Sequence, residues 1–78
     1  HADLKQLVAQ YPQLLGIGID ETTAIEVVGS QATVLGEGRV FFDQWIARDS
    51  GGEVVVTALS AGEVYDLAQR SVVESAVR

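Results

Sequence analysis

The sequence contains no cysteine. This absence excludes a disulfide-stapled mini-protein and a zinc site built from thiolates, two common ways for a chain of 78 residues to gain stability. A domain of this size buries only about 60% of its unfolded surface on folding, so its hydrophobic core is small. The hydrophobic share of 47% and the charged share of 21% argue for an ordinary globular domain rather than a disordered chain or a coiled coil.

Positive charge is also scarce. Five Lys and Arg stand against eleven Asp and Glu, the net charge is −6, and the basic residues are scattered. Because phosphate binding needs clustered cations, we expect no nucleic-acid partner. No apolar run approaches the ~20 residues that cross a bilayer, so we expect no membrane span. A basic leader followed by an apolar stretch is missing too, which predicts no signal peptide in this chain. The compartment is left open, with a cytoplasmic location favoured.

The beginning of the chain predicts a short helix followed by a buried strand. The helix is expected over residues 3–11, where Asp3 can cap it and apolar residues recur at helical spacing as far as Tyr11. Pro12 ends it, because the residue before a proline is pushed out of the helical region. Residues 14–19 are apolar on both faces of an extended chain, which is typical of a parallel strand covered on both sides.

The rest of the chain predicts β structure. Residues 23–60 contain short apolar, β-branched runs separated by glycine-containing turns, a pattern that indicates an antiparallel β meander. The tail, residues 61–78, fits either a helix or an irregular strand. The predicted fold class is therefore α/β, comprising a short helix, one buried strand and a C-terminal antiparallel β meander. A parallel sheet needs more strands and helices than these, so we expect a fragment of a larger fold.

Two stretches resemble a known family. The segment YPQLLGIGIDETTAIEVVGSQATVLGEGRV resembles the C-terminal region of cyanophycinase and its relatives in the dipeptidase E group of serine peptidases, where a P-x-L-L-G-I-G-I-D-E-x-T-A signature precedes a hairpin. The later VVVTALSAGEVYDLAQR is similar to the L-x-x-G-D-x-F-D-L-x-x-R ending of that family, with Glu63 for the usual Asp and Tyr65 for the usual Phe. Residues 41–52 depart from the family's pattern.

The resemblance implies a fold and a catalytic arrangement. The fold is a three-layer, flavodoxin-like α/β sandwich of the class I glutamine amidotransferase-like kind, of which this chain is a C-terminal fragment. In that family the nucleophilic serine lies in a G-x-S-A-G motif and the base histidine in a D-Q-H-F segment, and both precede the helix at residues 3–11. The resemblance thus implies no catalytic residue, cofactor or metal in this chain, which alone is expected to be inactive.

The implied function is the C-terminal portion of a cyanophycinase-like serine exopeptidase, a hydrolase acting on a peptide substrate. The N-terminal part of the same protein, or a companion chain, would complete the fold and supply the nucleophile and base. The alternative is a freestanding small β-rich binding or assembly module without enzymatic activity, for which a folded monomer or a homo-oligomer is expected.

Asp20, Glu21 and Thr22 are the candidate residues closest to an active site. They follow the predicted parallel strand, and α/β folds place ligands at the carboxyl ends of such strands. A carboxylate there could orient a neighbouring group or face a cationic substrate, which suits a family able to cleave β-linked Asp-Arg units. In the structural interpretation, the carboxylates cap the turn into Thr22 and Thr23 by accepting backbone N–H bonds. No Asp-x-Asp-x-Asp-Gly run accompanies them, so no metal site is predicted.

Two further residues carry a weaker catalytic interpretation. Ser60 follows a strand-like run and superficially resembles the serine of a nucleophile elbow, but Ala58 stands where that turn needs glycine. His1 is the only imidazole, and it lies at the chain terminus, where a base is poorly held. We therefore expect an ordinary turn serine and an exposed terminal histidine.

Overall fold

The structure is a computed structural model that describes residues 2–74, with side chains from residue 4 onward. The chain divides into two compact units, each built from two separate stretches of sequence. The first unit contains the stretch that ends at Gly18 and the stretch from Phe41 to Ala58. The second contains Ile19–Val40 and the stretch that starts at Leu59.

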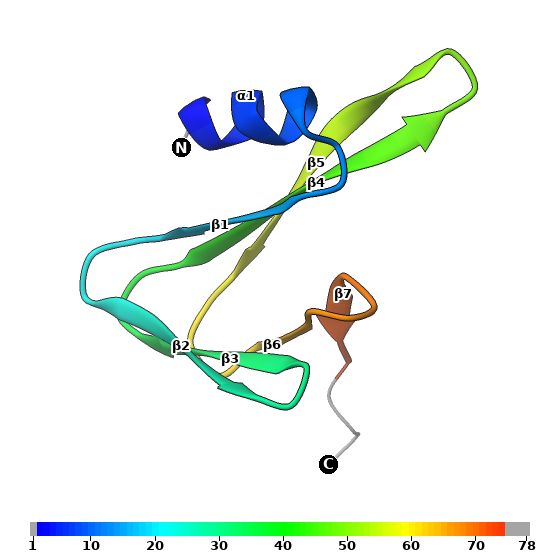
Figure 1. The fold of residues 1–78 in the computed structure, drawn as a ribbon. Helices are drawn as coiled ribbons and strands as arrows, with labels where there is room; N and C mark the ends of the chain where they lie inside the picture. Colours follow the sequence, from blue (N-terminus) through cyan, green and yellow to red (C-terminus); the bar gives the residue numbers. More distant parts are fainter. Residues whose placement is uncertain (1, 75–78) are drawn as a thin grey trace. The chain divides into compact units, whose positions relative to one another are not determined.

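One helix and seven strands make up the described residues (Figure 1). They are α1 (Ala2–Gln10), β1 (Leu15–Ile19), β2 (Thr23–Val28), β3 (Gln31–Gly36), β4 (Val40–Arg48), β5 (Gly51–Leu59), β6 (Val64–Asp66) and β7 (Ser71–Val73). The first unit holds α1 and a three-stranded sheet with the order β1-β4-β5. The second holds a four-stranded sheet with the order β2-β3-β6-β7. The tail predicted over 61–78 contains β6 and β7, and its residues 75–78 lie outside the described part.

The predicted fold class is wrong. The sequence predicts an α/β fragment of a three-layer flavodoxin-like sandwich, whereas the described chain is mostly β, with two antiparallel sheets and one short helix. The error comes from β1, whose apolar pattern is that of a parallel strand between two helical layers. β1 instead lies at the edge of an antiparallel sheet. A five-residue run is too short for its pattern to distinguish these two environments.

In the first unit, α1 packs directly against β1. Gly16 is buried beneath the helix, and a methyl group added to it would lie 2.8 Å from Leu4 Cδ1 and 2.9 Å from Val8 Cγ2. Val8 is itself only 1% exposed. A helix of nine residues is marginal in water by itself, so this contact with β1 stabilises it.

β4 is the central strand of this sheet, and both of its faces are covered. Phe42 and Asp43 are neighbours in sequence, so their side chains point to opposite faces, and both are 0% exposed. The hairpin of β4 and β5, with nine residues in each strand, continues past the five-residue β1 (Figure 1). In this hairpin the indole of Trp45 covers Gly52, where an added Cβ would lie 2.6 Å from Trp45 Nε1.

In the second unit, β2 and β3 form a hairpin whose register runs from Thr23↔Gly36 to Val28↔Gln31. The predicted glycine-containing turn lies between the strands, and Gly29 has the positive φ of 60° that such a turn requires. β3 also pairs with β6, which places the buried Tyr65 opposite the buried Ala32. The small core of this unit therefore lies on one face of β3 and β6.

Candidate functional site

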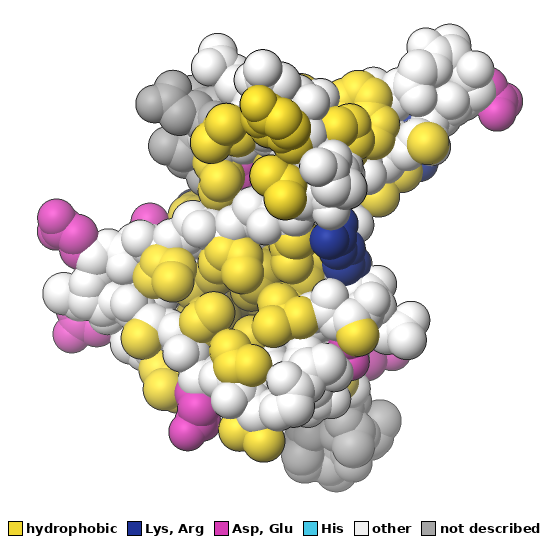
Figure 2. Space-filling model, viewed as in Figure 1, with side chains coloured by type: hydrophobic (Ala, Val, Ile, Leu, Met, Phe, Trp, Pro, Cys, Tyr) yellow, Lys and Arg dark blue, Asp and Glu magenta, His cyan; other side chains and the backbone are white. Residues whose placement is uncertain are grey.

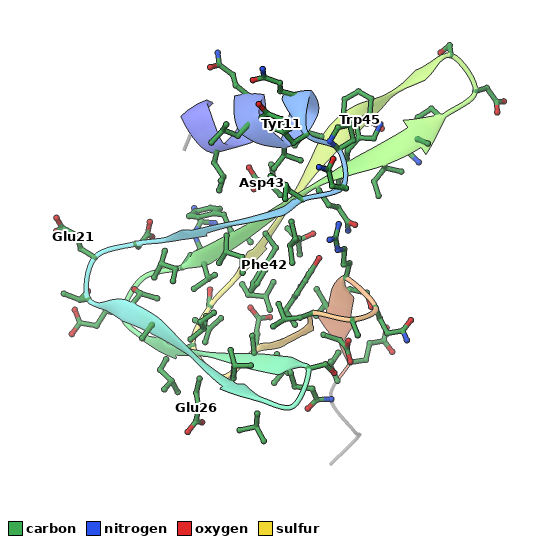
Figure 3. The ribbon with its side chains drawn as sticks, in the orientation of Figure 1. Tyr11, Glu21, Glu26, Phe42, Asp43 and Trp45 are labelled. Atoms are coloured by element: carbon green, nitrogen blue, oxygen red, sulfur yellow. The ribbon has the colours of Figure 1, made fainter. Side chains whose placement is uncertain are left out.

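Asp20, Glu21 and Thr22 form the connection between β1 and β2, in the second unit, and all three are exposed. Figure 3 shows Glu21 on the outside of this connection, with its side chain directed away from the strands. Because β1 belongs to an antiparallel sheet, the rule that places ligands at the carboxyl ends of parallel strands does not apply to these residues. Their chemistry has to be judged from their own contacts.

Asp20 is bonded twice to the backbone of Arg39. Its N–H donates to the Arg39 carbonyl oxygen at 3.1 Å, and its Oδ2 accepts from the Arg39 N–H at 3.0 Å. The structural interpretation predicts that a carboxylate here accepts a backbone N–H, and Asp20 does so. The donor, however, is Arg39 rather than Thr22 or Thr23. Asp20 thus ties the residue after β1 to the residue before β4.

The two threonines extend this clamp between the β1–β2 and β3–β4 connections. Thr22 Oγ1 donates to the Glu21 carbonyl oxygen at 2.5 Å, and the Thr22 carbonyl oxygen accepts from the Glu37 N–H at 3.1 Å. Thr23 Oγ1 donates to the same Glu21 oxygen at 3.1 Å and accepts from the Gly38 N–H at 2.8 Å. The hydroxyls are therefore engaged in holding the turn.

Thr22 carries backbone strain. Its φ of 58° lies in the left-handed region, where a β-branched residue is an outlier. Gly36, with a φ of 108°, lies so close to the Thr22 carbonyl oxygen that a side chain at position 36 would collide with it. Strained backbone is concentrated at functional sites. Thr22 is therefore kept as a candidate site residue because of its backbone conformation rather than its hydroxyl group.

The described residues contain no constellation for nucleophilic or metal catalysis. Within residues 2–74, no group of three His, Cys, Asp or Glu side chains could hold a metal ion. His1, the chain's single histidine, lies outside the described residues. Ser60 lies in a turn, where its N–H donates to Glu63 Oε1 at 2.6 Å and its carbonyl oxygen accepts from the Glu63 N–H at 3.0 Å. The strand β6 follows instead of a helix, so a nucleophile elbow does not form.

Asp43 is a residue that the sequence interpretation missed. Its carboxyl group is fully buried in the first unit, and this burial raises its pKa above the ordinary value of 3.8, while the charge of Lys5 on α1 acts in the opposite direction. Figure 3 shows Asp43 on the part of β4 near α1. The available signal was an acidic residue within the apolar stretch that starts at Val40. Its neighbours in the sequence, Phe42 and Gln44, are not nucleophiles, so this stretch of sequence contains no nucleophile that Asp43 could activate.

The candidate site therefore offers two exposed carboxylates on a strained turn: that of Asp20, which accepts the Arg39 N–H, and that of Glu21, which extends outward. Across residues 2–74, no helix combines the length and the apolar composition needed to cross a membrane. Comparisons of the chain with models of protein families and with curated proteins found no match.

Proposed function

We propose that this chain is the C-terminal, non-catalytic part of a serine peptidase similar to cyanophycinase. The nucleophile and the base would come from the N-terminal part of the same protein or from a companion chain. The resemblance of residues 11–40 supports this proposal. The observation that carries it is the outer edge of β1, with which no strand pairs in the described residues. The residues of β1 belong to the segment that carries the resemblance.

β1 has the properties of a strand that pairs on both sides. It is the terminal strand of its sheet, and in the described residues no strand pairs with its outer edge. An antiparallel ladder leaves the N–H and C=O groups of every second residue facing outward. Proteins usually protect such an edge with charges, proline or a bulge. The sequence of β1, LGIGI, has neither a charge nor a proline.

An exposed apolar stripe on the same unit, made of Leu7 on α1 and of Tyr11 and Leu14 after its end at Gln10, supports the same partner. The exposed fractions of these three residues are 49%, 45% and 47%. Figure 2 shows hydrophobic side chains grouped over α1. Each of these side chains is about half exposed, so burying the remainder would stabilise an association by roughly 1 kcal/mol each before the entropic costs. A partner that adds a strand to β1 and covers this stripe would complete the unit.

The turn after β1 would then have a defined role. Asp20 and the two threonines hold its backbone, which fixes the position from which the exposed Glu21 side chain extends. In the complete peptidase we assign Glu21 to the edge of the substrate site, facing a cationic peptide substrate, and Asp20 and Thr22 to positioning. The chain by itself would bind and cleave nothing as a peptidase.

A chimaeric enzyme tests this proposal. In a cyanophycinase, the C-terminal segment matching residues 11–70 is replaced by that of this chain, and hydrolysis of cyanophycin is measured. We expect a soluble, active chimaera. Ile19→Lys, which puts a charge on β1 at a residue that is 48% exposed, should abolish activity. Val72→Lys, on the edge strand β7 of the other sheet at a residue that is 44% exposed, should retain it. An inactive chimaera, equal activity in the two variants, or hydrolysis by the 78-residue chain alone would each overturn the proposal.

A freestanding β-rich module is the second candidate, because the chain buries apolar side chains of its own. Phe42, Val34 and Tyr65 are among the side chains that are at most 1% exposed. The module requires the isolated chain to unfold cooperatively and the chimaera to fail. The peptidase proposal requires the chimaera to work whatever the stability of the isolated chain.

A further inference from the structure

The opposite edge of the first unit's sheet is formed by β5, and its sequence favours strand pairing more than that of any other edge strand in the described residues. Residues 54–59 read VVVTAL, a six-residue run of β-branched and apolar residues without charge, proline or glycine. Such runs pair readily through their backbone when they lie at an edge. In the part of the chain that the structure describes, no strand pairs with the outer edge of β5.

We infer that the outer edge of β5 pairs in antiparallel orientation with β5 of a second copy of this chain. A two-fold axis brings the same strand together from both copies, so the edge has to be complementary to itself. The backbone of an antiparallel edge meets this condition, because its outward N–H and C=O groups alternate. The result is one continuous sheet of six strands, three from each copy.

The charges along β5 allow a second copy to pair there, although each copy has a net charge of −6. β5 contains a single charged residue, Glu53, which lies near the end of the strand and forms an ion pair with Arg48 at 2.8 Å. With Val56 at the two-fold axis, the two Glu53 side chains are about 20 Å apart, given about 3.4 Å per residue. Val56 then lies opposite its own copy, and β-branched pairs of this kind stabilise antiparallel strands.

The other edges are less suited to a second copy. β2 has Glu26 at its middle, β7 has only three residues, and two of the five residues of β1 are glycines, which weaken strand pairing. The hairpin of β4 and β5 also extends past β1, and a two-stranded ribbon is marginal in water without further pairing. The pairing through β5 leaves the outer edge of β1 unused, so this inference is independent of the proposed peptidase function.

The test is the molar mass of the 78-residue chain in solution, measured by light scattering and sedimentation. We expect a dimer of 16.6 kDa, twice the 8.3 kDa of one copy. Val56→Lys puts two like charges opposite each other and should weaken the dimer by about tenfold or more. The matched control is Val28→Lys on β2, at the most exposed of the large hydrophobic residues, which should leave the dimer intact.

Two measurements separate lost pairing from lost folding. Mixing Val56→Lys with Val56→Glu should restore a dimer, because opposite charges then face each other. Amide exchange in the parent should show protection of β5 that rises with protein concentration, with unchanged protection in β3. A parent that stays at 8.3 kDa, or an assembly that Val56→Lys leaves unchanged, overturns the inference. So does loss of the dimer to the same extent in Val28→Lys, or the absence of a mixed dimer.

Discussion

The contact between α1 and β1 depends on the absence of a side chain at position 16, and the substitution Gly16→Ala measures how much. The added methyl would lie 2.8 Å from Leu4 Cγ and Cδ1 and 2.9 Å from Val8 Cγ2. Carbon atoms prefer a separation of about 3.5–4.0 Å, so the helix or its side chains have to move by about 1 Å. Overpacking of this kind costs about 1–3 kcal/mol.

An opposing contribution comes from the unfolded chain. Alanine has less conformational freedom than glycine, which favours the variant by about 0.4–1 kcal/mol. The net expectation for Gly16→Ala is a loss of about 1–2 kcal/mol in the free energy of unfolding, measured by urea titration with circular dichroism. Leu4→Ala removes both contacts at 2.8 Å and leaves only the one with Val8. In that background the cost of Gly16→Ala should fall by about half, a coupling of roughly 0.5–1 kcal/mol.

Measuring Gly16→Ala both in the parent and in Leu4→Ala tests the steric explanation. If Gly16→Ala is as stable as the parent, α1 does not lie against β1 as described. If the cost is the same with and without the Leu4 side chain, the steric explanation is wrong and the loss has another origin.

Two further predictions concern Thr22 and Asp43. Thr22→Asn should raise the free energy of unfolding by about 0.5 kcal/mol. Asparagine tolerates the left-handed region, which costs other residues about 1–2 kcal/mol, and this gain exceeds the loss of the exposed hydrogen bond from Thr22 Oγ1 to the Glu21 carbonyl oxygen. Thermal unfolding measures the change, and a loss of stability would contradict the strain. For Asp43, burial raises the pKa of the folded form above 3.8, with Lys5 opposing, so the folded state binds this proton more tightly than the unfolded state. The stability that this group contributes is therefore present below about pH 4 and is lost as the pH rises through the raised pKa. Asp43→Asn should remove that decrease, so the difference in unfolding free energy between variant and parent should grow with pH; a constant difference from pH 3 to 7 would refute the assignment.

The local parts of the fold could be predicted because the determining residues are adjacent in sequence. Pro12 ends the helical pattern, and the glycine-containing turns predicted within residues 23–60 include the one at Gly29 between β2 and β3. The sheet partner of β1 could not be predicted. A run that is apolar on both faces has the same pattern beside a parallel or an antiparallel neighbour, and β4 is far away in the sequence.

The contacts of the candidate residues could not be predicted. The sequence shows that Asp20 and Glu21 follow an apolar strand, yet the partner of Asp20 is Arg39, and no local pattern links residues so distant in sequence. The strain at Thr22 was also beyond prediction, because threonine is a poor choice for a positive φ. Asp43 escaped notice because its burial follows from the central place of β4, which only the sheet order shows.

The discontinuous make-up of the two units has a consequence for how the chain folds. The chain passes from one unit to the other after Gly18, after Val40 and after Ala58, so neither unit is a continuous peptide that could form first and by itself. When the β2–β3 hairpin closes, the bonds between Asp20 and Arg39 bring together the ends of the loop that separates β1 from β4. Closing that loop early lowers the entropy that pairing β1 with β4 has to overcome. We therefore expect the hairpin to form early, so that mutations in it slow folding, whereas mutations in α1 mainly speed unfolding.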